Sequence, residues 1–382
     1  MPTYKAEFRA HYFEGRLHPR AHYAFGFIHT WARLVSQVPG LATLANVVTS
    51  TPILQAGAKW LADMEQSRSI PPFAPETFII WWARRPAKNL DKPKVVLFPD
   101  TFNNYFHPNV AKAAVEVLEA AGWQVVVPQK DMCCGRPLYD YGFMDAAGRW
   151  MSHILQTMTD EIQEELPFVF LEPSCGSVFQ DDMMKLMPGD ENAKRLNKNV
   201  FLLSDFLEKK SPEFAKQHPL KRKAVVHGHC HHKTVLDWSG EQKTLNKMGI
   251  ETETPEDGCC GMAGAFGFES EHFEVAQKCG ERVLLPKLEK TAKDTLVIAD
   301  GFSCREMISQ NTDRHALHMA EVIRMAMQEG PSGTQGDYPE RENITDPDPA
   351  ATHRSIFWIG AGLLALACIA SRLRRSGSDG AN

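Results

Sequence analysis

The sequence predicts an α/β protein with two similar lobes, each built on a parallel sheet and related to the other by an approximate two-fold axis. The motif Cys-Cys-Gly occurs twice, starting at Cys133 and at Cys259. Around each copy, strand-like segments alternate with helix-like segments, which is typical of the units that build parallel sheets. Matching landmarks also recur at nearly constant offsets: 130 residues from Asp100 to Cys230, 126 from Cys134 to Cys260, and 129 from Cys175 to Cys304.

The composition is that of an ordinary globular protein. Of the 382 residues, 43% are hydrophobic and 23% are charged, and the formal net charge is −5. This charge argues against a nucleic-acid-binding protein, which usually carries a basic face. The N-terminus has no apolar run typical of a secretory signal. We therefore expect the nine cysteines in a reducing compartment, where metal binding or redox chemistry is favoured over structural disulfides.

Residues 1–91 are expected to form a helical N-terminal segment. Apolar residues recur at helical spacing in HPRAHYAFGFIHTWARLVSQVPG and in TPILQAGAKWLADMEQ, and Pro and Gly separate these stretches. The segment contains no cysteine. We expect its tryptophans to pack the helices against the first lobe, and a partner-docking surface is the alternative: Trp31, Trp60, Trp81 and Trp82.

Residues 92–215 are expected to form the first lobe. KPKVVLFPD is a strand, PNVAKAAVEVLEAAGW is an amphipathic helix closed by Gly122, and QVVVP is a second strand. This second strand leads to Cys133 and Cys134. FVFLEPSC is a further strand that ends at Cys175, and NVFLLSDFLEK is a closing amphipathic helix.

Residues 216–328 are expected to repeat this order in the second lobe. The strand KRKAVVHGHC ends at Cys230, the helix EQKTLNKMG follows, and the strand IETETP leads to Cys259 and Cys260. The strand TLVIADGFSC ends at Cys304, and RHALHMAEVIR is the closing helix. Ligands of open α/β sheets bind at the carboxyl ends of the strands, where all of these cysteines lie.

The C-terminal residues predict a tether and a membrane anchor. Residues 329–353 are rich in Pro, Gly and Asp and are typical of a flexible linker. Residues 354–372 contain the uncharged run SIFWIGAGLLALACIAS, whose helix would be about 25 Å long, the short end of a bilayer span. A buried core helix and a helix that lies in the membrane interface are the alternatives.

Two signals in the sequence bear on the membrane orientation, and they favour opposite orientations. The basic tail, residues 373–382 together with Arg372 directly before it, favours a cytoplasmic C-terminus. The thiols and the lack of a signal sequence favour cytoplasmic lobes. One span cannot satisfy both, and we expect a membrane-anchored protein with cytoplasmic lobes.

Four thiols of the second lobe are candidates for one metal centre: Cys230, Cys259, Cys260 and Cys304. Four converging thiolates suit an iron–sulfur cluster or a tetrahedral zinc ion. Adjacent cysteines favour the cluster, because their side chains point to opposite faces of an extended chain and can reach different iron atoms. Zinc is the second interpretation, and inert buried thiols are the third.

The first lobe supplies Cys133, Cys134 and Cys175, and Asp100 stands where the second lobe has Cys230. A carboxylate can ligate iron, although it is a harder ligand than a thiolate. Three interpretations stay open: a cluster with one oxygen ligand, an incomplete site, or three thiols that serve the cluster of the other lobe.

The remaining candidates near the thiols are the histidines of HGHCHHK, namely His227, His229, His231 and His232. One or two of them could face a cluster, where hydrogen bonds to sulfide or a supply of protons are favoured over direct ligation. Cys279 and Cys368 are expected to be packing residues.

These motifs resemble the cysteine-rich CCG module of heterodisulfide reductase B subunits, of the iron–sulfur subunits of glycolate oxidase and anaerobic glycerol-3-phosphate dehydrogenase, and of lactate-utilisation proteins. The greatest likeness is to the C-terminal part of fused FAD-linked oxidases of the D-lactate/glycolate dehydrogenase type. There, similar phrases occur in the same order: PDTFNNYFHP, CCGRPLYD, LEPSCGSVF, VHGHCHHK, GCCGMAGAFGFE and ADGFSCRE. The resemblance covers residues 4–327.

The resemblance implies one or two [4Fe-4S] clusters, of the cubane or the non-cubane kind. Their ligands would be two sets of cysteines: Cys230, Cys259, Cys260 and Cys304 in the second lobe, and Cys133, Cys134 and Cys175 in the first. The sequence departs from the family pattern in two ways. The final C-x-x-C is reduced to one cysteine in each lobe, with Glu172 and Gly301 at the vacant positions. The relatives also carry a ferredoxin domain and a flavin domain. Residues 1–91 resemble a remnant of the ferredoxin-type domain that lacks its cysteines.

We therefore expect an iron–sulfur electron-transfer protein or subunit of a membrane-associated, FAD-linked 2-hydroxy-acid oxidoreductase system. The expected partner is a dehydrogenase that contains flavin and ferredoxin domains, and the membrane anchor would bring the lobes close to a quinone pool. One alternative is a heterodisulfide reductase-like enzyme that reduces a disulfide at a non-cubane cluster. The other is a structural zinc protein of the same fold.

Overall fold

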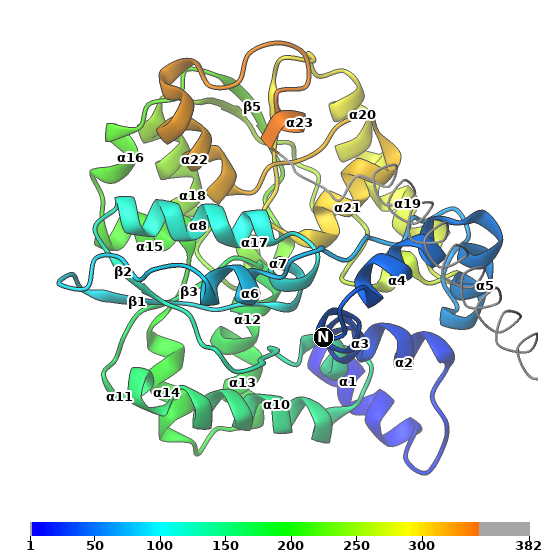
Figure 1. The fold of residues 1–382 in the computed structure, drawn as a ribbon. Coiled ribbons are helices and arrows are strands. Elements are labelled where there is room, and N and C mark those ends of the chain that lie inside the picture. The colour runs from blue at the N-terminus through cyan, green and yellow to red at the C-terminus, as the bar shows by residue number, and fades with distance from the viewer. Residues whose placement is uncertain (1, 344–382) are drawn as a thin grey trace, which may run out of the picture.

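A computed structural model of the chain describes residues 2–343. Within them, the strands form two separate parallel sheets with helices around them (Figure 1). The strand order is β2-β1-β3-β4 in the first sheet and β6-β5-β7 in the second. The strands have these bounds: β1 Lys94–Leu97, β2 Gln124–Val126, β3 Phe168–Phe170, β4 Val200–Leu202, β5 Lys223–Val226, β6 Glu251–Glu253 and β7 Leu296–Ile298.

The two sheets repeat one another, as the sequence predicts. In the first sheet β1 pairs with β2 and β3, in the second β5 pairs with β6 and β7, and every pair is parallel. Beside β7, an isolated parallel bridge joins Ile298 to Leu317 and takes the place that β4 has beside β3. The central strands β1, β3, β5 and β7 are almost wholly buried, which is typical of a parallel sheet covered by helices on both faces.

Short helices surround both sheets. Those of the first lobe are α7 Thr101–Tyr105, α8 Pro108–Ala120, α9 Arg136–Asp140, α10 Met144–Thr157, α11 Thr159–Gln163, α12 Pro173–Ser177, α13 Met183–Leu186, α14 Glu191–Lys198, α15 Leu203–Lys210 and α16 Phe214–Gln217. Those of the second lobe are α17 Cys230–Thr234, α18 Ser239–Met248, α19 Phe273–Arg282, α20 Leu284–Glu289, α21 Phe302–Asn311, α22 Met319–Glu329 and α23 Glu340–Asn343.

The lobes are joined by helices that pack across their boundary. Helix α22 of the second lobe packs on α8 of the first, and α15 of the first lobe packs on α18 of the second. Figure 1 shows α8 and α22 side by side between the two sheets. One hydrophobic core therefore contains residues of both lobes, such as Val117 and Phe206 with Val226 and Ile323. Because this core is shared, the strand ends of the two lobes are held in fixed relation to each other.

The N-terminal segment consists of helices that lie against both lobes. Their bounds are α1 Pro2–Tyr12, α2 Arg20–Gly26, α3 Ile28–Gln37, α4 Leu41–Ser50, α5 Pro52–Ala62 and α6 Phe78–Ala83. Trp81 and Trp82 of α6 pack against the shared core, as expected. Trp31 and Trp60, however, are 46% and 66% exposed. The expectation that all four tryptophans pack inward is therefore wrong for these two, because they lie on the outer faces of α3 and α5.

Two further segments differ from the sequence-based expectation. Val200–Leu202, interpreted as the start of a helix, forms strand β4, and α15 begins only at Leu203. The first part of the expected linker also packs on the second lobe, because Glu340 is fully buried in an ion pair with Arg314.

The expected anchor and basic tail, residues 354–382, and the second part of the linker lie outside the described residues. No helix within residues 2–343 is both long and apolar enough to cross a bilayer.

Candidate metal centre

The four thiols of the second lobe lie at the carboxyl ends of its parallel strands. Cys230 is the first residue of α17, which follows β5. Cys259 and Cys260 lie in the loop after β6, and Cys304 lies in the first turn of α21, after β7. These ends meet at one edge of the sheet, so residues up to 74 positions apart in the chain reach the same place.

The structure brings these four sulfurs into one contiguous cluster. The thiol of Cys259 interacts with those of Cys230 and Cys260, and the thiol of Cys260 also interacts with that of Cys304. Cys260 and Cys304 are buried, whereas Cys230 and Cys259 are partly exposed. The cluster therefore has a closed inner side and an accessible edge.

Gly261 makes the approach of the adjacent cysteines possible. Its φ of +98° lies in a region that residues with a side chain rarely adopt. A Cβ at this position would overlap the carbonyl oxygen of Ala276 in α19. The Gly261 amide donates a hydrogen bond of 3.3 Å to the sulfur of Cys259, as an amide would to a metal-bound thiolate.

The pKa values of the four thiols show how closely they interact. Hydrogen bonds from Cys230 and Cys260 lower the pKa of Cys259 to about 2, and a hydrogen bond from Cys260 lowers the pKa of Cys304. The interaction with Cys259 raises the pKa values of Cys230 and Cys260. Deprotonation of one sulfur of this group therefore disfavours deprotonation of its neighbours. All four can be deprotonated only when cations lie between them.

His227 is the histidine that faces the sulfurs. A ligand atom of this ring lies within 4.8 Å of the sulfurs of Cys260 and Cys304. Its Nδ1 is 2.5 Å from Oδ2 of Asp257, and the ring also interacts with the thiol of Cys304. Burial alone would lower the pKa of His227, but the Cys304 sulfur and the Asp257 carboxylate raise it to about 10. A protonated ring at this position would donate a hydrogen bond toward a cluster and offset its negative charge.

The other histidines of the HGHCHHK motif have different surroundings. The Nδ1 of His229 accepts a hydrogen bond from the amide of His231 and caps the N-terminus of α17. The Nε2 of His231 is 3.3 Å from Nη2 of Arg136 in the first lobe. His232 is fully buried on the other side of α17, beside Glu241.

The first lobe brings together three thiols. The sulfurs of Cys134 and Cys175 are 3.0 Å apart, and Cys133 interacts with Cys134. All three are buried. The amide of Gly135 donates to the Cys133 sulfur over 3.4 Å, which repeats the contact of Gly261 with Cys259.

Asp100 caps helix α7. Its carboxylate accepts hydrogen bonds from the amides of Phe102 and Asn103 and from the side chain of Asn103. Burial and the nearby Glu172 raise the pKa of Asp100 to about 6. Because its oxygens are engaged in capping, the role of Asp100 as an iron ligand stays a prediction.

The strand register gives a different match for Asp100 from the one that the sequence suggested. Strands β1 and β5 begin at Lys94 and Lys223, which are 129 residues apart. The same offset matches Asp100 with His229, and both residues cap the helix that follows. Thr101, not Asp100, then stands where the second lobe has Cys230. Its hydroxyl is 3.6 Å from the Cys133 sulfur.

Sequence reasoning missed an aspartate–histidine pair beside each Cys-Cys motif. In the first lobe, Oδ1 of Asp131 is 3.1 Å from Nε2 of His29, a residue of the N-terminal helix α3. Nδ1 of the same ring is 2.9 Å from the hydroxyl of Thr101. In the second lobe the corresponding pair is Asp257 and His227. The signal was present in the sequence, because both copies read Asp-x-Cys-Cys-Gly.

The two thiol clusters are neighbours. Helix α12, which carries Cys175, packs against α17, which carries Cys230. Oε2 of Glu172, at one of the vacant C-x-x-C positions, accepts a hydrogen bond of 2.7 Å from the amide of Phe302, next to Gly301 at the other. The His231–Arg136 contact adds a second link between the lobes.

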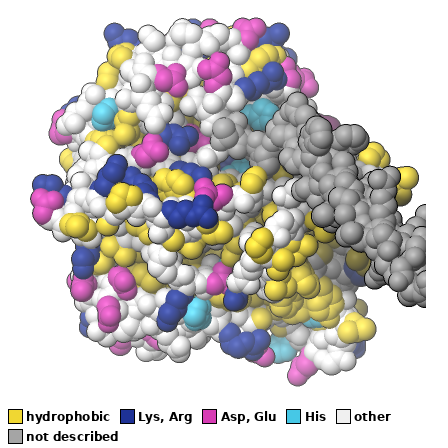
Figure 2. All heavy atoms as spheres, viewed as in Figure 1, with side chains coloured by type: hydrophobic (Ala, Val, Ile, Leu, Met, Phe, Trp, Pro, Cys, Tyr) yellow, Lys and Arg dark blue, Asp and Glu magenta, His cyan; other side chains and the backbone are white. Residues whose placement is uncertain are grey.

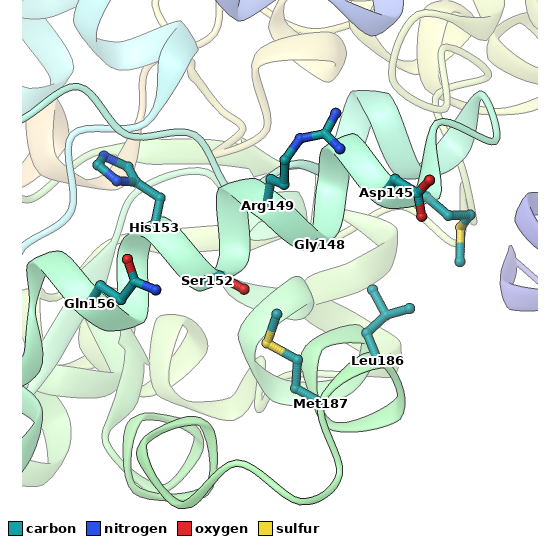
Figure 3. Close-up of a pocket in the computed structure, with 9 residues that line it drawn as sticks. Asp145, Gly148, Arg149, Ser152, His153, Gln156, Leu186 and Met187 are labelled. Atoms are coloured by element: carbon teal, nitrogen blue, oxygen red, sulfur yellow. The ribbon is translucent and has the colours of Figure 1, made fainter.

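A surface hollow of about 710 Å³ lies apart from the thiols, between α10 and the C-terminal end of α13 (Figure 3). Its lining combines polar and apolar side chains: Met144, Asp145, Arg149, Ser152, His153, Gln156, Leu186 and Met187, with Gly148. Nε2 of His153 is 3.1 Å from the carbonyl oxygen of Asp131 and so touches the loop of Cys133. None of the cysteines within residues 2–343 lines this hollow.

These observations fit a metal centre held by thiolates, such as an iron–sulfur cluster. The second lobe offers four clustered thiols, an amide donor to sulfur and a histidine beside the sulfurs. Two parallel-sheet lobes that gather cysteines at their strand ends define the class, a thiolate metal-binding protein of α/β fold.

Comparisons with known proteins identify the family. The family model CCG, cysteine-rich domain, matches residues 97–180 and 240–309. Lactate utilization protein A of Bacillus velezensis is 31% identical over 245 residues, which cover 60% of this chain and 98% of that protein. The chain therefore belongs to the family of cysteine-rich CCG-domain proteins.

Two further relatives indicate the range of the family. A subunit of the anaerobic glycerol-3-phosphate dehydrogenase of Escherichia coli is 27% identical over 293 residues, which cover 75% of this chain and 72% of that protein. D-2-hydroxyglutarate dehydrogenase of Pseudomonas putida is 27% identical over 231 residues. The match covers 60% of this chain but only 22% of that dehydrogenase.

Gly261→Ala is expected to prevent assembly of the centre in the second lobe while all four thiols remain. The new Cβ would overlap Ala276, and the positive φ adds strain of about 1–3 kcal/mol. Gly264→Ala is the matched control, because Gly264 also has a positive φ but has open space around it. Iron and sulfide per chain should fall in the first variant and not in the second. Equal iron contents in Gly261→Ala and the wild type would contradict this role of Gly261.

Proposed function

We propose that this chain is the iron–sulfur electron-transfer subunit of a membrane-associated, FAD-linked 2-hydroxy-acid oxidoreductase system. The observation that carries the proposal is the cluster of four thiols at the strand ends of the second lobe. Cys230, Cys259, Cys260 and Cys304 would hold a [4Fe-4S] cluster there. Cys133, Cys134 and Cys175 would hold a second cluster, in the first lobe. An approximate two-fold axis would relate the two lobes. The reciprocal packing of α22 on α8 and of α15 on α18 supports that symmetry.

The residues around the thiols are suited to electron transfer. An iron–sulfur cluster supplies one-electron redox chemistry, with a potential set by charge, burial and hydrogen bonds. The buried Cys260 and Cys304 exclude water from one side, and the partly exposed Cys230 and Cys259 form the edge through which electrons would enter or leave. The His227–Asp257 pair would compensate the charge that reduction adds.

We propose a dehydrogenase partner that contains flavin. The names of the relatives support a dehydrogenase partner, and an exposed apolar face supports a protein partner. Of the 17 exposed large hydrophobic side chains among the described residues, 13 lie in the N-terminal segment between Tyr4 and Leu61. Figure 2 shows apolar side chains gathered over this segment. A concentration of this kind exceeds the scattered apolar residues of ordinary surfaces and is typical of protein interfaces.

Cys259→Ser and Cys260→Ser are each expected to lose the cluster of the second lobe, because a hydroxyl is a poor substitute for a bridging or terminal thiolate. Cys279→Ser is the matched control, since Cys279 lies exposed on α19. Iron, sulfide and electron paramagnetic resonance of anaerobically purified protein measure the loss. Unchanged iron in both variants, or stoichiometric zinc without sulfide in the wild type, would sink the proposed function.

Trp31→Ala and Trp60→Ala are expected to weaken binding of the flavin-containing dehydrogenase subunit by about tenfold or more each, as truncation of an interface tryptophan commonly does. Calorimetric titration of the purified subunits gives the Kd. Val275→Ala is the control, because Val275 is exposed on α19 outside the N-terminal segment. Wild-type affinity in both tryptophan variants would show that the partner binds elsewhere.

Removal of residues 344–382 is expected to move the protein from the membrane fraction to the soluble fraction, because the uncharged run would be lost. Removal of only residues 373–382 should leave the protein with the membranes. Fractionation of cell lysates followed by immunoblotting measures both. A full-length chain found in the soluble fraction would refute the anchor and the proposed location of the lobes at the cytoplasmic side of the membrane.

A further inference from the structure

Three polar side chains meet in the interior of the second lobe, apart from the thiols. They are His232 of α17, Glu241 of α18 and Asp300, two residues after the end of β7. One ligand atom from each lies within 4.8 Å of the others. Their exposed fractions are 0%, 2% and 5%. Three segments of the chain thus place a ring nitrogen and two carboxylates at one buried point.

The imidazole of His232 is only partly satisfied at this point. Its Nδ1 lies 3.3 Å from Oε2 of Glu241, within ion-pair distance. Its Nε2 is buried and has no hydrogen-bond partner among the described residues. Buried polar groups without partners are rare and costly, so an occupant that uses these atoms is favoured.

Asp205 adds a third carboxylate from the first lobe. It lies in α15, is 5% exposed, and its Oδ1 is buried without a hydrogen-bond partner. Its carboxylate occupies the space where a side chain of Gly240 would begin, immediately before Glu241. Two buried acidic groups around one imidazole, with a third beside them, need positive charge to be stable in the interior.

The nearby cations among the described residues are engaged elsewhere. The buried guanidinium of Arg305 donates hydrogen bonds to the backbone carbonyl oxygens of Ala299 and Asp300, and no ion pair joins it to a carboxylate of this group. The positive charges of Lys209 and Lys243 interact electrostatically with Asp205, but both lysine side chains are exposed to solvent. His318 lies 3.5 Å from Asp300, but its Nε2 also contacts the carbonyl oxygen of Leu171 at 2.9 Å.

We propose that His232, Glu241 and Asp300 bind a divalent first-row cation, Zn²⁺ or Mn²⁺, with Asp205 beside it. One imidazole and two or three carboxylates form a ligand set that such ions prefer, and it contains no thiolate that would direct iron–sulfur assembly to it. The ion has a structural role. It ties α17, which begins with Cys230, to the end of β7 and to the first turn of α18, and through Asp205 it joins the two lobes.

Metal analysis of the anaerobically purified full-length protein tests the proposal. Mass spectrometry should find one zinc or manganese ion per chain in addition to iron. Glu241→Gln and Asp300→Asn keep the side-chain volume, and they should lose this ion while iron and inorganic sulfide remain at wild-type levels. Glu208→Gln is the matched control, because Glu208 lies on α15 near Asp205 but pairs with Lys247 instead. It should keep the ion.

A metal titration followed by thermal unfolding gives a second test, for the case that a variant purifies in low yield. Wild-type protein treated with a chelator should show a rise in melting temperature when Zn²⁺ or Mn²⁺ is added. The Glu241→Gln variant should need at least about tenfold more metal for the same rise. Wild-type protein without zinc or manganese, and without a response to either ion, would overturn the proposal. It would leave His232 and Glu241 as a buried ion pair. The iron–sulfur assignment would stand in that case, because its test depends on iron, sulfide and other residues.

Discussion

The mutual repulsion of four adjacent sulfurs is the constraint on which the rest of the structure depends. Cys230, Cys259, Cys260 and Cys304 interact so closely that they cannot all be thiolates unless cations lie among them. The proposed iron–sulfur cluster would remove this conflict and would supply redox chemistry at the strand ends. The shared hydrophobic core of the two lobes holds those strand ends in place, since helices of each lobe pack on the other. Packing that is remote from the sulfurs therefore fixes their separation.

The sequence was most informative about features that depend on a single strand and the residues directly after it. Parallel strands bring their carboxyl ends to one edge, so cysteines that follow a strand predict a common site even when they are far apart in the chain. This reasoning predicted the duplicated sheets and the convergence of the second-lobe thiols. It also located the Cys-Cys-Gly loop, because glycine at a positive φ is required where two thiols turn toward one centre.

The sequence was less informative where tertiary contacts decide. Asp100 was matched with Cys230 because their offset of 130 residues is close to the offsets of the other landmarks, but strand pairing aligns it with His229, and both residues cap a helix. The short strand β4 looked like the start of a helix because the apolar residues Val200–Leu202 run directly into α15. His29 could not be assigned from the sequence, since its partner Asp131 is 102 residues away and on another element. In each case the missing information was which elements are neighbours in space.

The two thiol sites differ in what surrounds them, and the difference suggests an order of electron flow. The second site has His227 and Asp257 of its own lobe beside its thiols, whereas the first has His29 of α3, paired with Asp131. The same helix α3 presents Trp31 to the solvent, on the face proposed for the dehydrogenase partner. A partner bound there would lie about one helix diameter, roughly 10 Å, from the first thiol site. The contact of α12 with α17 then joins the first site to the second. Electrons from a flavin would thus reach Cys133 and its neighbours before they reach the four-thiol centre.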